Sequence, residues 1–174
     1  MKNFSKQNRN FKKFLHFPEI LFDFHFILRY NITVIKREEL KMKTVYLDMD
    51  GTIADLYDQP NWLERLHEED ASVFEECKPM VSEMKIRNLF PNENFELKIL
   101  SMTPLNASEN YCKKVENAKN KWLDKYFPSI TNRIYLKYGK NKNLKNSKNA
   151  ILIDDSEEIR NNFKGMAINP KELW

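Results

Sequence analysis

Short apolar runs alternate with longer amphipathic stretches downstream of residue 41, and this pattern predicts strands that alternate with helices. A long stretch, residues 107–127, repeats its apolar side chains at helical spacing, and residues 156–163 predict a shorter helix. Strands alternating with helices favour a parallel sheet, and continuous apolar runs favour a sheet covered on both faces. The expected fold class is therefore α/β. The predicted strands are residues 45–47, 95–100, 133–137, 150–153 and 166–168.

A polar-faced segment, residues 57–91, separates the first predicted strand from the second. Three short helices are expected in it. Asn61 can cap the first, Asp70 or Ser72 can start the second, and Pro79 suits the first turn of the third. We expect this insert to form a small helical cap. A long crossover connection is the plain alternative.

The richest pattern is the sequence Asp-x-Asp-Gly-Thr, which directly follows the first predicted strand. Asp48 and Asp50 lie one residue apart, and Gly51 and Thr52 turn the chain. Two carboxylates this close resist joint ionisation, so the pair favours either a cation between them or two different roles. The spacing suits a hard cation such as Mg²⁺, which binds one or two carboxylates together with a phosphate. An ordinary acidic turn is the alternative, since Asp-Gly is a common turn dipeptide.

Further polar clusters follow the later predicted strands. Ligands bind at the carboxyl ends of the strands in open α/β sheets, so these clusters are candidate parts of the same site. Lysines are frequent throughout residues 137–148, and a solvated basic loop is the competing interpretation there. The clusters are Ser101 with Thr103 as a rival, Lys142 with Lys140 as a rival, and the pair Asp154 and Asp155.

Taken in order, these clusters resemble the four motifs of the haloacid dehalogenase (HAD) superfamily of phosphotransferases, over residues 42–168. The resemblance implies a Rossmann-like parallel sheet and hydrolysis of phosphomonoesters through an aspartyl-phosphate. Asp48 would be the nucleophile, and Asp50 would be the general acid and base. Ser101, Lys142 and Thr52 would bind the substrate phosphate.

The resemblance also implies a Mg²⁺ cofactor. Its ligands would be Asp48, the backbone carbonyl of Asp50, and one or both of Asp154 and Asp155. An alternative of another class is a binding or regulatory domain that keeps the fold without catalysis. The presence of every required acid in the sequence argues against that alternative.

Within the superfamily, a short helical cap and an Asp-Asp fourth motif resemble the 5′(3′)-deoxyribonucleotidase group. That resemblance extends to the Trp-Leu-rich helix at residues 122–126 and implies a nucleoside monophosphate as substrate. Recognition of the base would fall to Tyr57 or Trp62. The sequence departs from the group at Met102, which follows Ser101 where the group has adjacent hydroxyl residues. A phosphatase acting on nucleic-acid ends or on sugar phosphates is the alternative, because a small cap limits substrate size only loosely.

Composition changes abruptly near residue 41. Residues 1–41 hold nine Lys and Arg against four Asp and Glu, whereas the rest of the chain holds 20 against 21. Seven of the twelve Phe also lie in residues 1–41. We therefore expect a basic N-terminal extension, dispensable for catalysis, before a HAD-like domain at residues 42–174. The extension is either upstream sequence that is not native or an arm that contacts anionic surfaces.

Overall composition limits the function classes. The net charge of +4 does not indicate a general nucleic-acid binder. Cys77 and Cys112 form neither a metal-binding spacing nor a disulfide framework, which favours a reducing cytoplasm. The apolar run at residues 20–28 is too short to span a bilayer, and no cleavage site typical of a secretory signal follows it.

Overall fold

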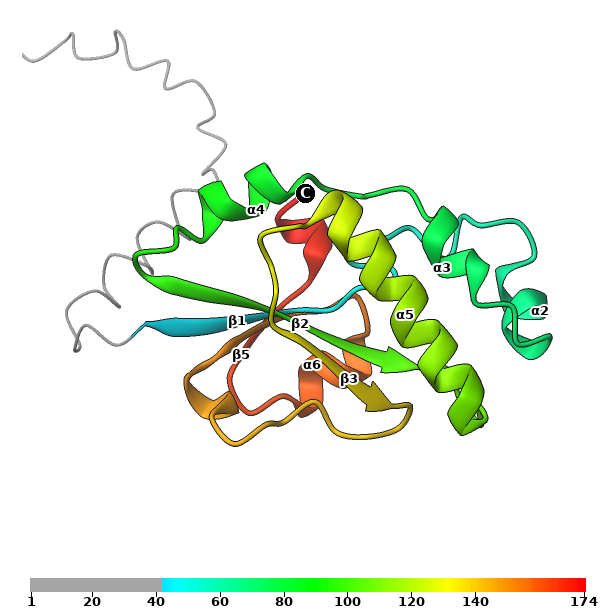
Figure 1. Ribbon diagram of the computed structural model, residues 1–174. Coiled ribbons are helices and arrows are strands. Elements are labelled where there is room, and N and C mark those ends of the chain that lie inside the picture. The colour runs from blue at the N-terminus through cyan, green and yellow to red at the C-terminus, as the bar shows by residue number, and fades with distance from the viewer. Residues whose placement is uncertain (1–41) are drawn as a thin grey trace, which may run out of the picture. The chain divides into compact units, whose positions relative to one another are not determined.

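A five-stranded parallel sheet forms the centre of residues 42–174, the part of the chain that the computed structural model describes (Figure 1). The strands lie in the order β3-β2-β1-β4-β5, and every neighbouring pair is parallel. The α/β prediction is confirmed at this level, whereas the expectations about residues 1–41 lie outside the described residues. The strands are β1 (Lys43–Leu47), β2 (Phe95–Thr103), β3 (Arg133–Lys137), β4 (Ile151–Ile153) and β5 (Met166–Ile168).

Helices fill the connections between successive strands. Three short helices follow β1, as the insert at residues 57–91 predicts, and the 18-residue helix α5 joins β2 to β3. In Figure 1 the arrowheads of β2 and β3 point toward the side of the molecule where α2 and α3 lie. The helices are α2 (Trp62–His67), α3 (Ser72–Glu76), α4 (Glu83–Leu89), α5 (Glu109–Tyr126) and α6 (Glu157–Asn162), with short 3₁₀ helices η1 (Ser147–Asn149) and η2 (Pro170–Glu172).

The alternation of β2 side chains shows which helix covers which face of the sheet. Leu100 packs with Tyr46, Leu152 and Phe163 in one buried cluster, and Ile159 of α6 packs against that cluster. Ser101, the next residue along β2, points to the opposite face, and its hydroxyl contacts Lys119 of α5. Helices α5 and α6 therefore cover opposite faces, and α5 crosses in front of the sheet in Figure 1. The central strand β4 is buried throughout and β1 over its last three residues, as continuous apolar runs predict, whereas the edge strands β3 and β5 are more exposed.

Strand β1 lies in the middle of the sheet, at the point where the strand order reverses. The chain moves outward from β1 through β2 to β3, and then returns to place β4 on the other side of β1. The crevice outside the carboxyl ends of such a pair of strands is the usual ligand-binding position in open α/β sheets. The candidate site therefore belongs at the ends of β1 and β4.

Two helix starts differ from the sequence-based expectation. Helix α4 begins at Glu83, because the Ser82 hydroxyl caps it, and Pro79 instead pairs with Ala54 in an isolated bridge. Helix α5 begins after Ser108, whose hydroxyl accepts a hydrogen bond from the third residue beyond it. In both cases a serine with an extended backbone provides the cap, and serine is among the strongest capping residues.

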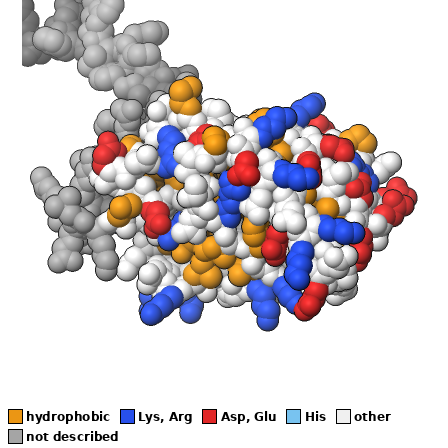
Figure 2. All heavy atoms as spheres, viewed as in Figure 1, with side chains coloured by type: hydrophobic (Ala, Val, Ile, Leu, Met, Phe, Trp, Pro, Cys, Tyr) orange, Lys and Arg blue, Asp and Glu red, His pale blue; other side chains and the backbone are white. Residues whose placement is uncertain are grey.

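The surface of the described region carries both signs of charge. Figure 2 shows Lys and Arg side chains interspersed with Asp and Glu on the face in view. Among residues 42–174, no helix combines the length and the apolar character that crossing a membrane requires.

Candidate active site

The register between β1 and β4 brings the first and last acidic motifs together. Leu47 pairs with Ile153, so Asp48 and Asp154 leave the two strands side by side. The backbone N–H of Asp48 donates to the carbonyl of Ile153 at 2.9 Å. Carboxylate oxygens of Asp48, Asp154 and Asp155 all lie within 4.8 Å of one another. Asp48 thus forms one cluster with the adjacent pair Asp154 and Asp155, although Asp154 lies 106 residues further along the chain.

A tight turn follows Asp48 and shapes the rest of the motif. The Met49 carbonyl accepts hydrogen bonds from the three N–H groups at residues 52–54, at 2.9–3.2 Å. Gly51 has φ 74°, and a Cβ built there would lie 2.4 Å from the Tyr57 ring and 2.8 Å from a carboxylate oxygen of Asp155. Glycine is therefore required at this position both for its backbone conformation and for space.

Thr52 joins the first acidic motif to the last. Its side chain is buried, and its hydroxyl accepts a hydrogen bond from the Asp155 N–H at 3.1 Å. The same hydroxyl lies 3.3 Å from Oδ1 of Asp155 and 3.5 Å from Oδ2 of Asp48, so it can donate to either carboxylate. Sequence analysis placed Thr52 at the substrate phosphate, whereas its contacts in the structure are with the acids themselves.

Lys142 is the lysine that reaches the acidic cluster. Its Nζ lies 2.6 Å from Oδ1 of Asp48 and 2.7 Å from Oδ2 of Asp154, and the residue is buried. Burial alone would lower the pKa of Lys142, but the two carboxylates outweigh it and hold the pKa above its ordinary value. Lys140, the rival in the sequence, is exposed and forms no ion pair with a described residue.

A second buried lysine, Lys119 of α5, was missed by sequence reasoning. Its side chain is fully buried, and its Nζ lies 2.5 Å from Oδ2 of Asp50 and 2.9 Å from the Ser101 hydroxyl. The same ammonium donates to the Met102 carbonyl at 2.8 Å and lies 4.7 Å from the centre of the Phe74 ring. Lys119 therefore connects Asp50 to strand β2 and to helix α3 of the insert.

The sequence does carry a signal for Lys119. Val115, Lys119 and Trp122 are spaced i, i+4 and i+7 along α5, so the lysine lies on the same buried stripe as its apolar neighbours. A lysine on the apolar stripe of a helix is rarely fully buried unless it is paired with an acid. That position could have been recognised as a functional candidate before the structure was known.

Asp50 differs from Asp48 in its partners. One oxygen of Asp50 pairs with Lys119, and the other, Oδ1, is buried and has no hydrogen-bond partner among the described residues. Burial is the main cause that raises the pKa of Asp50, Lys119 opposes the rise, and the charge of Asp48 adds to it. The side chain thus combines a fixed orientation, an elevated pKa and one buried oxygen without a hydrogen-bond partner.

The acids at the end of β4 also have elevated pKa values. Burial, followed by the charge of Asp48, raises the pKa of Asp154 from 3.8 to about 7. The same two causes, in the same order, raise the pKa of Asp155. Carboxylates that are crowded and buried in this way resist ionisation without additional positive charge.

Of the two candidates in the second motif, Ser101 contacts a lysine of the site and Thr103 does not. Strand β2 continues beyond its predicted end at residue 100, so Ser101 and Thr103 both lie within it and pair with β3. The hydroxyl of Ser101 is buried against Lys119. The hydroxyl of Thr103 faces the carbonyl of Leu136 on β3 at 3.5 Å.

The acidic cluster has the chemistry of a site for a hard divalent cation. Asp48, Asp154 and Asp155 each offer a carboxylate oxygen, and oxygen is the ligand that Mg²⁺ prefers. The carboxylate of Asp50 is not part of this cluster, and one of its oxygens pairs with Lys119 instead. A metal role for Asp50 therefore rests on its backbone carbonyl alone.

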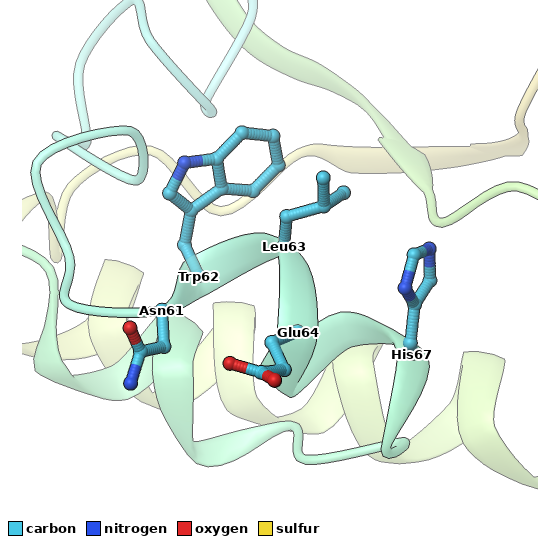
Figure 3. Close-up of a pocket in the computed structure, with 5 residues that line it drawn as sticks. All are labelled: Asn61, Trp62, Leu63, Glu64 and His67. Carbon is cyan, nitrogen blue, oxygen red and sulfur yellow. The ribbon is translucent and has the colours of Figure 1, made fainter.

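The first insert helix presents side chains that are separate from the acids. Trp62, Leu63 and His67 project to the same side of α2 and line a shallow pocket, shown in Figure 3. Tyr57 packs edge-to-face on Trp62, with ring centres 5.1 Å apart, and also lies against Gly51. The pocket itself contains none of the acids or lysines of the site, whereas Tyr57 borders both regions.

Comparison with known proteins assigns no family to the chain. A scan against protein-family models finds no match, and a search of curated proteins finds no significant relative. The case for function therefore depends on the geometry of the residues.

Proposed function

We propose that this protein is a Mg²⁺-dependent phosphomonoester hydrolase of the haloacid dehalogenase type, acting through an aspartyl-phosphate. The observation that carries the proposal is the different pairing of Asp48 and Asp50. Asp48 pairs with Lys142, whereas Asp50 pairs with Lys119 and keeps one buried oxygen without a partner. Acids in environments this different suit a division into nucleophile and proton donor.

Asp48 is the proposed nucleophile. Lys142 holds one of its oxygens at 2.6 Å, which leaves the other oxygen, 3.5 Å from Thr52, to attack phosphorus. Attack forms the bond between the Asp48 oxygen and phosphorus while the bond from phosphorus to the leaving oxygen breaks. The positive charge of Lys142 also stabilises the negative charge that develops on the equatorial oxygens in the transition state.

Asp50 is the proposed acid and base. Its elevated pKa favours a protonated carboxyl at the start of the reaction, and its unpartnered oxygen would donate that proton to the leaving oxygen. The carboxylate that remains takes a proton from water, which attacks phosphorus and releases inorganic phosphate from Asp48. Asp50 is then protonated again. Lys119 fixes the direction of the carboxyl throughout, so the proton is delivered from one oxygen.

The cation and the substrate complete the proposal. Asp48, Asp154 and Asp155 would hold Mg²⁺, which supplies positive charge that offsets the repulsion between an anionic nucleophile and an anionic substrate. A nucleoside monophosphate is the proposed substrate, because Tyr57 lies against Gly51 of the acidic turn and packs on Trp62, so an aromatic ring is available next to the site to stack on a base. Tyr57 is 51 % exposed, which leaves part of its ring open to a ligand.

A screen of phosphomonoesters tests this function. The purified protein should release phosphate from nucleoside 5′-monophosphates when Mg²⁺ is present and should lose that activity in a chelator. Preference for an oligonucleotide 3′-phosphate or for a sugar phosphate would support the proposed reaction but contradict the proposed substrate. A protein that is folded and binds Mg²⁺ but hydrolyses none of these esters would contradict the proposal and favour a binding domain.

A further inference from the structure

Trp174 makes a contact with the acidic turn that the proposed reaction does not use. Its indole N–H donates to the carbonyl of Thr52 at 3.1 Å, although the two residues lie 122 positions apart. The 3₁₀ helix η2, red in Figure 1, precedes Trp174 and anchors it, because the backbone N–H of Trp174 donates to the Pro170 carbonyl at 3.0 Å. Leu173 is buried beside it.

The Thr52 carbonyl depends on this contact. Thr52 is fully buried. Within residues 42–174, the Trp174 indole is the only group that donates a hydrogen bond to its carbonyl. A buried carbonyl without a donor loses the interaction that it would otherwise make with water, which is costly. If the indole N–H were removed, Thr52 would gain by turning its carbonyl toward solvent, and the turn would move with it.

Such a movement would reach the proposed cation ligands directly. The Thr52 hydroxyl lies 3.5 Å from Asp48 and 3.3 Å from Asp155, and it accepts the N–H of Asp155 at 3.1 Å. A shift of Thr52 therefore changes the spacing between one acid of the first motif and one of the last. Hard cations with strict coordination geometry are sensitive to that spacing.

We propose that Trp174 is a positioning residue, which holds the Thr52 turn so that Asp48 and Asp155 converge on one cation. The inference rests on the proposed function for its consequence in catalysis, but not for the geometry itself. The indole acts through Thr52 and touches neither the substrate nor the cation. Its role is comparable to that of the outer groups that orient metal ligands in other proteins.

The test replaces Trp174 with phenylalanine in the full-length chain, which keeps an aromatic ring and removes the N–H. Trp122→Phe is the matched control, because the Trp122 indole also donates to a buried carbonyl, that of Cys77 at 2.7 Å, which is not one of the site residues. Each variant loses one hydrogen bond from an indole N–H to a backbone carbonyl. Only Trp174→Phe loses one at the acidic turn.

Two measurements separate positioning from general stability. The Kd for Mg²⁺, obtained from the dependence of the melting temperature on Mg²⁺ concentration, should increase about five- to tenfold in Trp174→Phe, the scale of one hydrogen bond. Hydrogen exchange at the Asp155 amide of the metal-free protein should accelerate by a similar factor. Neither quantity should change in Trp122→Phe. Equal effects in both variants, or no effect in Trp174→Phe, would overturn the inference.

A measurement on the wild type covers the case in which Trp174→Phe fails to fold. In a ¹H–¹⁵N spectrum, the Trp174 indole resonance should shift when Mg²⁺ is added, while the Trp122 indole resonance stays in place. A Trp174 resonance that does not respond to Mg²⁺ would overturn the inference. These readouts need no substrate, so absence of phosphatase activity would contradict the proposed function and leave the positioning role to be judged on exchange and metal binding.

Discussion

The two buried lysines divide the candidate site into two halves that differ in what they hold. Lys142 comes from a loop, lies between Asp48 and Asp154, and neutralises charge where three acids converge. Lys119 comes from the middle of α5, holds a single oxygen of Asp50, and packs against the Phe74 ring. The Lys142 half brings one positive and three negative side chains together, and the Lys119 half orients the carboxyl of Asp50.

This difference explains how two acids in one short motif can take different roles. Asp48 and Asp50 are separated by one residue, yet the turn after β1 sends them to different lysines. Different surroundings are the means by which paired carboxyl groups acquire different protonation states. The comparison therefore predicts that damage to each half will produce a different kinetic defect.

The largest effect should follow from removing the acid of the Lys142 half. Asp48→Asn should lower turnover by about 10³-fold or more, because no aspartyl-phosphate can form on an amide. The variant should remain folded, since it removes one negative charge from a crowded cluster, and circular dichroism would check that. Activity within tenfold of the wild type would contradict the assignment of the nucleophile.

Removing the lysine of that half should have the next largest effect. Lys142→Ala should reduce turnover by about 10²-fold, the scale of losing one preorganised charge. Lys140→Ala is the matched control, because Lys140 is exposed and lies two residues away in the same loop. The control should retain nearly full turnover. If the two variants exchanged their effects, the assignment of the third motif would be off by two residues.

The Lys119 half should respond in its pH dependence as well as its rate. Lys119 lowers the pKa of Asp50, so Lys119→Met should raise that pKa and move the corresponding limb of the pH–rate profile to higher pH. Turnover at the new optimum should fall about tenfold, because the carboxyl is no longer oriented. Lys142→Ala should move this limb in the same direction but less, because Lys142 lowers the pKa of Asp50 less than Lys119 does. An unchanged pH profile in Lys119→Met would contradict the proposed role of Lys119.

The smallest effect concerns stability without metal. The pKa of Asp154 is about 7 in the folded protein against an ordinary 3.8, so the folded state holds a proton that the unfolded state has released. The free energy of unfolding should therefore fall as pH rises from about 4 to about 7. Melting temperatures in a chelator should show this fall, and saturating Mg²⁺ should flatten it. A metal-free protein that gains stability over that range would contradict the account.

The sequence predicted the sheet better than the helix starts. Apolar runs are direct signals of buried strands, and β3 and β5 begin and end at the predicted residues. Helix starts depend on which polar side chain caps the first turn. Ser82, rather than the predicted Pro79, starts α4, and Ser108 caps α5, which was expected to start at residue 107. Local chemistry offered several candidates there, and tertiary packing decided among them.

Site residues were predictable where a motif identifies them and hidden where only the fold brings them together. Asp48 and Asp154 stand at strand ends, and strand ends in a parallel sheet share one edge. Lys119 lies 69 residues from Asp50 and inside a helix. The pair could therefore be predicted only after the crossing of α5 over β2 was known. The donor from Trp174 to Thr52 has no local sequence signal for the same reason.

The most direct test of the central claim follows a single turnover of p-nitrophenyl phosphate, whose leaving group needs no proton at neutral pH. Asp50→Asn should release about one equivalent of p-nitrophenolate in a burst and then stall, because the aspartyl-phosphate forms but water is not activated. Asp48→Asn should give no burst. Mass spectrometry after borohydride reduction should find the modified residue at position 48. A burst in Asp48→Asn, or a stalled Asp50→Asn enzyme without phosphate on Asp48, would contradict the division of roles.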